Sequence, residues 1–66
     1  MTETASFKVF CLECYKNTHG MKGRDAFNLF KQYGVLDYIG SFYKVLHGYG
    51  HQCIVQDIDE FIATRR

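Results

Sequence analysis

Cysteine and histidine are the residue types in this chain that could carry chemistry. Cys11 and Cys14 form a C-x-x-C pair, which is typical of one half of a zinc site, and His47, His51 and Cys53 could supply the other half. The pair lies inside a helical pattern, however, whereas structural zinc sites usually hold this motif in a tight turn. Because free cysteine is among the most buried residue types, we predict core cysteines with no metal and no cofactor. A zinc-binding module stays open as the second alternative.

A nucleophilic site can also be drawn from these residues. Cys53 could act with His51 or His47 as its base and Asp57 as the orienting acid. A helical chain of 66 residues has little room for a cleft of the usual size, and the glycines do not form a phosphate-binding loop. We therefore expect no enzyme activity, no catalytic residues and no small-molecule substrate.

The elements that must position these residues are helices. Phe7, Phe10, Cys11, Cys14 and Tyr15 recur at helical spacing, which predicts a helix over Thr4–Thr18 that ends before Gly20. Val9 and Leu12 project from the opposite side of this helix, where apolar residues suggest a second contact surface or incidental exposure.

Two further helices follow on either side of Gly34. The first is predicted over Arg24–Tyr33 and the second over Val35–His47. On this second helix the apolar residues cover about half of the cylinder, wider than the stripe of an ordinary surface helix. It should therefore contact more than one neighbour.

The last part of the chain changes character. The two glycines in Gly48–Gly50 argue against helix, and the β-branched pair Ile54-Val55 predicts an extended segment near 52–56, either a buried connector or an edge that pairs with another chain. Three acidic residues then open a short helix that begins at Asp57 and docks through Ile58, Phe61 and Ile62.

Composition places the chain among small globular proteins. It has 47% hydrophobic residues, eight Lys and Arg that are scattered and a net charge of +1, so it lacks the basic stripe of a nucleic-acid binder. We find neither a membrane span nor a signal peptide. Three cysteines without framework spacing suggest reduced thiols in the cytoplasm.

These patterns predict a single helical domain over residues 1–66. The fold class is all-α, a compact bundle of three helices plus a short C-terminal helix, with the extended segment near 52–56. The predicted core is Phe7, Phe10, Cys11, Cys14, Phe27, Phe30, Leu36, Ile39, Phe42, Leu46, Ile58, Phe61 and Ile62.

Three stretches resemble a known family. They are FKVFCLECYK (Phe7–Lys16), LFKQYGVLDYI (Leu29–Ile39) and VLHGYGHQCIVQDIDEFI (Val45–Ile62), of which the closing motif is the most specific. They are similar to a family of short bacterial proteins of unknown function found in gut Firmicutes, often encoded beside predicted ADP-ribosyltransferase-like proteins. The resemblance implies an accessory or antitoxin-like partner role and transfers no catalytic residue.

The leading hypothesis is a non-enzymatic protein–protein interaction module that self-associates or binds a protein partner. It rests on an apparent excess of apolar faces. The predicted interface residues are Val9, Leu12, Tyr38, Ile54, Asp59 and Glu60.

The first alternative is a small helix-turn-helix DNA-binding protein built on the two helices around Gly34. The polar face of the second helix carries one basic residue, Lys44, and one acidic residue, Asp37. This is too few hydrogen-bonding side chains to read base edges. We therefore do not expect nucleic-acid binding.

Overall fold

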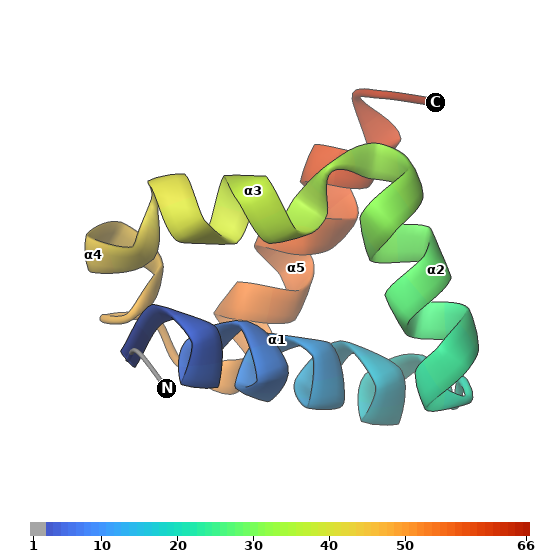
Figure 1. The fold of residues 1–66 in the computed structure, drawn as a ribbon, viewed down its shortest axis with the longest axis horizontal. Coiled ribbons are helices and arrows are strands. Elements are labelled where there is room, and N and C mark those ends of the chain that lie inside the picture. The colour runs from blue at the N-terminus through green and yellow to red at the C-terminus, as the bar shows by residue number, and fades with distance from the viewer. Residues whose placement is uncertain (1–2) are drawn as a thin grey trace.

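The computed structural model describes residues 3–66, except for the side chain of His51. In this part the chain is all-α, as predicted, with five helices: α1 (Glu3–His19), α2 (Gly23–Tyr33), α3 (Val35–Ser41), α4 (Tyr43–Leu46) and α5 (His51–Ala63). Figure 1 shows α1 to α4 as the four sides of a frame, with α5 crossing behind it. Side chains from all sides fill the frame and form the core.

The first two helices end where the sequence predicts. At the end of α1, Gly20 has a φ of 63°, and the amide of Met21 donates to the carbonyl of Lys16, 2.9 Å away. Gly34 has a φ of 69°, and its amide donates to the carbonyl of Phe30. Both glycines occupy the left-handed region that other residues adopt only at a cost, so the chain turns sharply at both places.

The predicted helix Val35–His47 is wrong as a single element, because it is broken at Phe42. This residue has φ −110° and ψ 25°, outside the helical region, and it separates α3 from α4. The Gly40-Ser41 pair directly before it is a typical site of helix kinks. The break lets Leu46 and Tyr43 turn toward α1, where the Tyr43 ring meets Phe7 edge-on at 5.3 Å between centroids.

The predicted extended segment near 52–56 is also wrong, since α5 begins at His51 and includes it. Ile54, Val55, Ile58 and Ile62 form one helical face, and each is at most 4% exposed. Burial of this face outweighs the weak extended preference of the Ile54-Val55 pair. The helix therefore starts six residues before the predicted Asp57.

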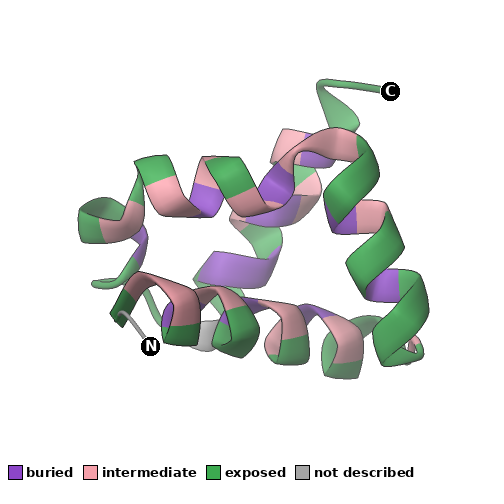
Figure 2. Ribbon diagram, in the orientation of Figure 1, coloured by how far each residue is buried: buried purple, intermediate pink, exposed green. Residues whose placement is uncertain are grey.

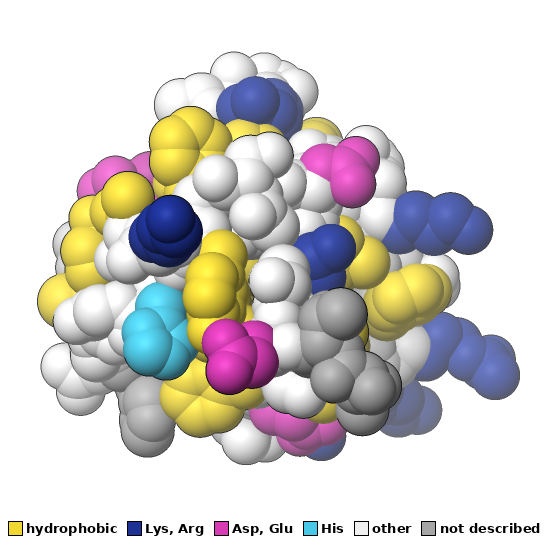
Figure 3. Space-filling view, turned by 60° about the vertical axis from the view of Figure 1, so that its left-hand side comes forward, with side chains coloured by type: hydrophobic (Ala, Val, Ile, Leu, Met, Phe, Trp, Pro, Cys, Tyr) yellow, Lys and Arg dark blue, Asp and Glu magenta, His cyan; other side chains and the backbone are white. Residues whose placement is uncertain are grey.

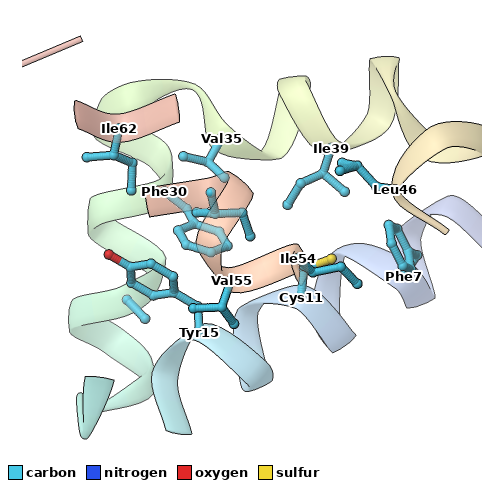
Figure 4. Close-up of a cluster of buried hydrophobic side chains, with 12 residues drawn as sticks. Phe7, Cys11, Tyr15, Phe30, Val35, Ile39, Leu46, Ile54, Val55 and Ile62 are labelled. Atoms are coloured by element: carbon cyan, nitrogen blue, oxygen red, sulfur yellow. The ribbon is translucent and has the colours of Figure 1, made fainter. Parts of the chain in front are cut away.

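Figure 4 shows the core, with side chains from the frame and from α5 pointing toward one another. Its buried members are Phe7, Cys11, Tyr15, Ala26, Phe30, Val35, Ile39, Leu46, Ile54, Val55, Ile58 and Ile62. Three predicted core residues are exposed instead, namely Phe10, Phe27 and Phe42, and Cys14, Leu36 and Phe61 are half-buried. Figure 2 shows the same division, with buried residues facing inward and exposed ones outward.

The chain packs as tightly as a monomer of its size should. Its Cα radius of gyration is 10.8 Å, and the general relation for 66 residues gives about 11 Å. Its accessible surface is 4527 Å², close to the roughly 4,300 Å² expected for this mass. The described chain is therefore as compact as expected, but six of its large apolar side chains stay at least 40% exposed, and what matters is where they lie.

No helix among the described residues is both long and apolar enough to span a lipid bilayer.

Candidate functional site

One apolar surface lies where α3 passes into α4. Phe42 and Val45 are 49% and 54% exposed there. Figure 3 looks onto the side of the molecule that carries α4, and hydrophobic side chains reach the surface there between charged ones. Phe42 lines two neighbouring hollows. We call Phe42, Val45 and these two hollows the Phe42 surface.

The larger hollow lies between α3 and the end of α5, and we call it the aromatic hollow. It has a volume of about 340 Å³, and its main lining residues are Tyr33, Asp37, Tyr38, Phe42, Phe61 and Arg65. The second hollow, of about 270 Å³, lies on the other side of Phe42 and includes Thr4, Tyr43, Lys44 and Val45.

Stacked rings build the wall of the aromatic hollow. The ring of Tyr38 stacks on Phe61 with centroids 4.1 Å apart and planes 25° apart, and Phe42 lies 5.1 Å from Tyr38. The guanidinium carbon of Arg65 lies 3.7 Å from the centroid of Phe61, a cation–π contact. The wall therefore combines ring faces with one cation.

Tyr38 is held in place from α5. Its hydroxyl donates a hydrogen bond of 2.5 Å to Oδ2 of Asp57. Burial, and then this bond to a negatively charged acceptor, raise the pKa of Tyr38 to about 12. The phenol therefore stays a donor across the physiological range, and α3 stays tied to α5 beside the hollow.

Opposite charges lie at the rim of the aromatic hollow. Asp37 comes from α3 and Arg65 from the chain after α5. Among the described residues neither of them forms an ion pair, and the same holds for Lys44 beside the second hollow. All three charges therefore lack a partner of opposite charge among the described residues, although Arg65 also lies over the Phe61 ring and donates a hydrogen bond of 3.3 Å to Oγ1 of Thr64.

The six predicted interface residues do not form one surface. Val9 is exposed on the outer side of α1, while Leu12 is half-buried against the core. Tyr38 lies in the wall of the aromatic hollow. Ile54 is 1% exposed in the core, so its prediction as an interface residue is wrong, because it depended on an extended edge that is a buried helix.

The two predicted acidic residues on α5 differ in their roles. Glu60 is exposed beside Tyr49 and Cys53. Asp59 contacts α1 instead, with its carboxylate oxygens 3.0 and 3.1 Å from Nε2 of His19. Burial and the charge and hydrogen bond of Asp59 raise the pKa of Tyr15. Asp59 therefore joins α5 to α1.

The Cys and His residues do not assemble as a metal site in the described part of the chain. No three His, Cys, Asp or Glu side chains gather there in an arrangement that could hold an ion. Cys11 is fully buried on α1, and burial raises its pKa to about 12, so the thiolate that zinc requires is disfavoured. The side chain of His51 lies outside the described residues.

One hollow does gather groups of the hydrolytic type. Glu3, Ser6 and His47 line a volume of about 580 Å³ with Phe7 and Tyr43. A nucleophile must be hydrogen-bonded to its base, and no such bond joins Ser6 to His47. The His47 ring packs against Phe7 and Tyr43 instead, with centroids 5.9 and 5.2 Å apart. Its visible role is to cover the end of the core.

The helix-turn-helix alternative finds little support in α3. The helix has seven residues, VLDYIGS, without Arg, Lys, Asn or Gln. A recognition helix needs such side chains to reach base edges. Lys44 follows on α4, beyond the break at Phe42.

A family model described as "Protein of unknown function (DUF3791)" matches residues 6–65. The chain belongs to this family. The expected membership of a family of unknown function is thus confirmed. No curated protein and no solved structure matches the chain. In this DUF3791 protein, the matched range includes every main lining residue of the aromatic hollow.

Sequence reasoning found Tyr38 but missed Phe42, Val45 and Arg65. Helical periodicity places Phe42 on the buried face of an unbroken helix. The Gly40-Ser41 pair was the local signal for a break. Arg65 lies four residues after Phe61, so helical spacing could have paired these two residues, but their position beside Tyr38 depends on how α5 packs against α3.

Proposed function

We propose that this protein is a non-enzymatic protein–protein interaction module that binds its partner through the Phe42 surface. The observation that supports this is the exposed ring of Phe42 between two hollows, one of them walled by Tyr38, Phe61 and Arg65. Aromatic residues and Arg are the types that dominate binding energy when a partner excludes water from them.

The placement of exposed aromatic residues favours this surface over others. Phe27 on α2 is almost as exposed as Phe42, at 45% against 49%, but it lines neither of the two hollows beside Phe42. A single exposed apolar side chain is normal in a monomer. Phe42 differs because it lines both hollows, with Val45 in one and the aromatic wall in the other, and because Asp37, Lys44 and Arg65 beside it form no ion pair among the described residues.

The resemblance noted in the sequence suggests one class of partner. The resemblance implies that relatives are often encoded beside predicted ADP-ribosyltransferase-like proteins, and such a protein is the first purified partner to test. We place the encounter in the cytoplasm, where the free thiols of Cys11, Cys14 and Cys53 would stay reduced.

A comparison of three baits tests the proposal. The natural chain, Phe42→Glu and Phe27→Glu are each immobilised in a lysate of the source cell, and retained proteins, including free copies of the chain itself, are quantified by mass spectrometry. We expect at least one protein to be retained by the natural chain and by Phe27→Glu, and to be lost about tenfold or more with Phe42→Glu, as for an interface hot spot.

Phe27→Glu is the matched control, because it places the same charge at an equally exposed Phe away from the Phe42 surface. Circular dichroism must show that both variants keep the helicity of the natural chain. If the folded Phe42→Glu variant retains the same proteins in the same amounts, the proposed binding surface is wrong.

A further inference from the structure

We infer that the partner at the Phe42 surface is a second copy of this chain, related to the first by a two-fold axis close to Phe42. The inference rests on the proposed function and names the partner for the same surface. It is carried by two independent features, shape and charge.

The shape of the surface is self-complementary. The half-exposed ring of Phe42 forms one side of an open, aromatic-walled hollow of about 340 Å³. A two-fold rotation near Phe42 brings the ring of each copy toward the hollow of the other. In such an isologous contact the same patch serves both sides, so one protruding ring and one hollow per chain are sufficient.

The charges are self-complementary too. The rim of the hollow carries Asp37 on α3 and Arg65 beyond α5, and neither forms an ion pair within the described chain. A two-fold rotation places Asp37 of each copy opposite Arg65 of the other, which gives two ion pairs per dimer. A partner of one charge sign would leave one of these rim charges unmatched.

The chain exposes enough surface for an interface of standard size. A stable interface of standard size buries about 800 Å² per partner, which is less than a fifth of the 4527 Å² that this chain exposes. The two hollows that share Phe42 are lined by residues of α3 and α4 and by Phe61 and Arg65, and a contact of that size would have to include both of them.

Light scattering on a sizing column, over a concentration series, tests the dimer. We expect the natural chain and Phe27→Glu to rise from 7.7 kDa toward twice that mass. Phe42→Glu should stay monomeric over the same range, with dimer affinity at least about tenfold weaker. A natural chain that stays monomeric at every concentration, or a dimer that Phe42→Glu leaves unchanged, overturns the inference.

A mixing experiment tests the two-fold arrangement. Asp37→Arg and Arg65→Asp each place like charges opposite one another in a homodimer, so each variant alone should dimerise about tenfold more weakly. When the two are mixed, both cross-pairs become attractive, and a heterodimer should form with affinity near that of the natural chain. Because mixing cannot repair a misfolded subunit, recovery supports the arrangement, and its absence overturns it.

The two proposals can fail separately. A monomeric natural chain that still retains another protein through Phe42 removes the second copy as the partner and leaves the interaction module intact. If Phe42→Glu retains every protein, including free copies of the chain, as well as the natural chain does, both proposals are wrong.

Discussion

Tyr38 has two roles at the scale of a single residue. Its ring forms part of the aromatic wall against Phe61, and its hydroxyl ties α3 to Asp57 on α5. The first role needs only a ring, and the second needs only the hydroxyl. The two can therefore be separated by removing one oxygen atom.

Tyr38→Phe should lower stability and change its dependence on pH. We expect a loss of about 1–3 kcal/mol in the free energy of unfolding, as for a hydrogen bond to a charged group. The pKa of Tyr38 is raised from 10.0 to about 12, so the folded state favours the protonated phenol. Its stabilisation is therefore complete below pH 10 and is lost as the pH rises through about 12. Urea unfolding and tyrosinate absorbance over this range measure both effects.

Tyr49→Phe is the control for this prediction, because the phenol of Tyr49 is exposed and forms no hydrogen bond among the described residues. It should keep the stability of the natural chain. If Tyr38→Phe kept both the stability and the late-titrating tyrosine, the hydrogen bond to Asp57 would not form in solution.

At the scale of the element, α3 depends on two glycines for different reasons. Gly34 starts the helix with a φ of 69°, in the left-handed region. Gly40 has no such φ, but a Cβ there would lie 3.2 Å from Cε and 3.3 Å from Nζ of Lys8 on α1. The first glycine is needed by the backbone, whereas the second only makes room for the flexible end of a lysine.

Alanine at these two positions should therefore have opposite effects. Gly34→Ala should cost about 1–2 kcal/mol, the penalty of a side chain in the left-handed region. Gly40→Ala should be neutral or stabilise by up to about 1 kcal/mol, since alanine favours helix and the end of Lys8 can move aside. Chemical denaturation of both variants measures the difference. Equal losses would mean that Lys8 is fixed against α3.

At the scale of the whole molecule, stability depends on α5, which crosses the frame of the other helices and fills it from behind (Figure 1). Its face of Ile54, Val55, Ile58 and Ile62 meets the core residues of α1, α2 and α3. A core of this size supplies only about 3–5 kcal/mol. One missing side chain in this face can therefore remove most of the stability.

Ile54→Ala should cost about 2–5 kcal/mol, as for other large-to-small changes in cores, and leave the chain largely unfolded at room temperature. Cys53→Ala, at the neighbouring exposed position, should change stability by less than about 0.5 kcal/mol. Circular dichroism and urea titration compare the two. Similar behaviour of both variants would contradict the helical register of α5.

The sequence by itself determined the all-α class, the ends of the first two helices and most of the core. Strong local signals did this, namely apolar residues at helical spacing and glycines at Gly20 and Gly34 that accept a left-handed backbone. These signals act within a few residues, so they can be read without knowing what packs against them.

Only the tertiary structure decided the break at Phe42, the helical state of residues 52–56 and the composition of the Phe42 surface. At the break, contacts of Tyr43 and Leu46 with the rest of the core replace helical continuity and leave Phe42 outside. In α5, burial of Ile54 and Val55 outweighs their extended preference. The aromatic hollow joins Tyr38 to Phe61 and Arg65, which are more than twenty residues away. Such contacts depend on how distant segments meet, and periodicity does not encode this.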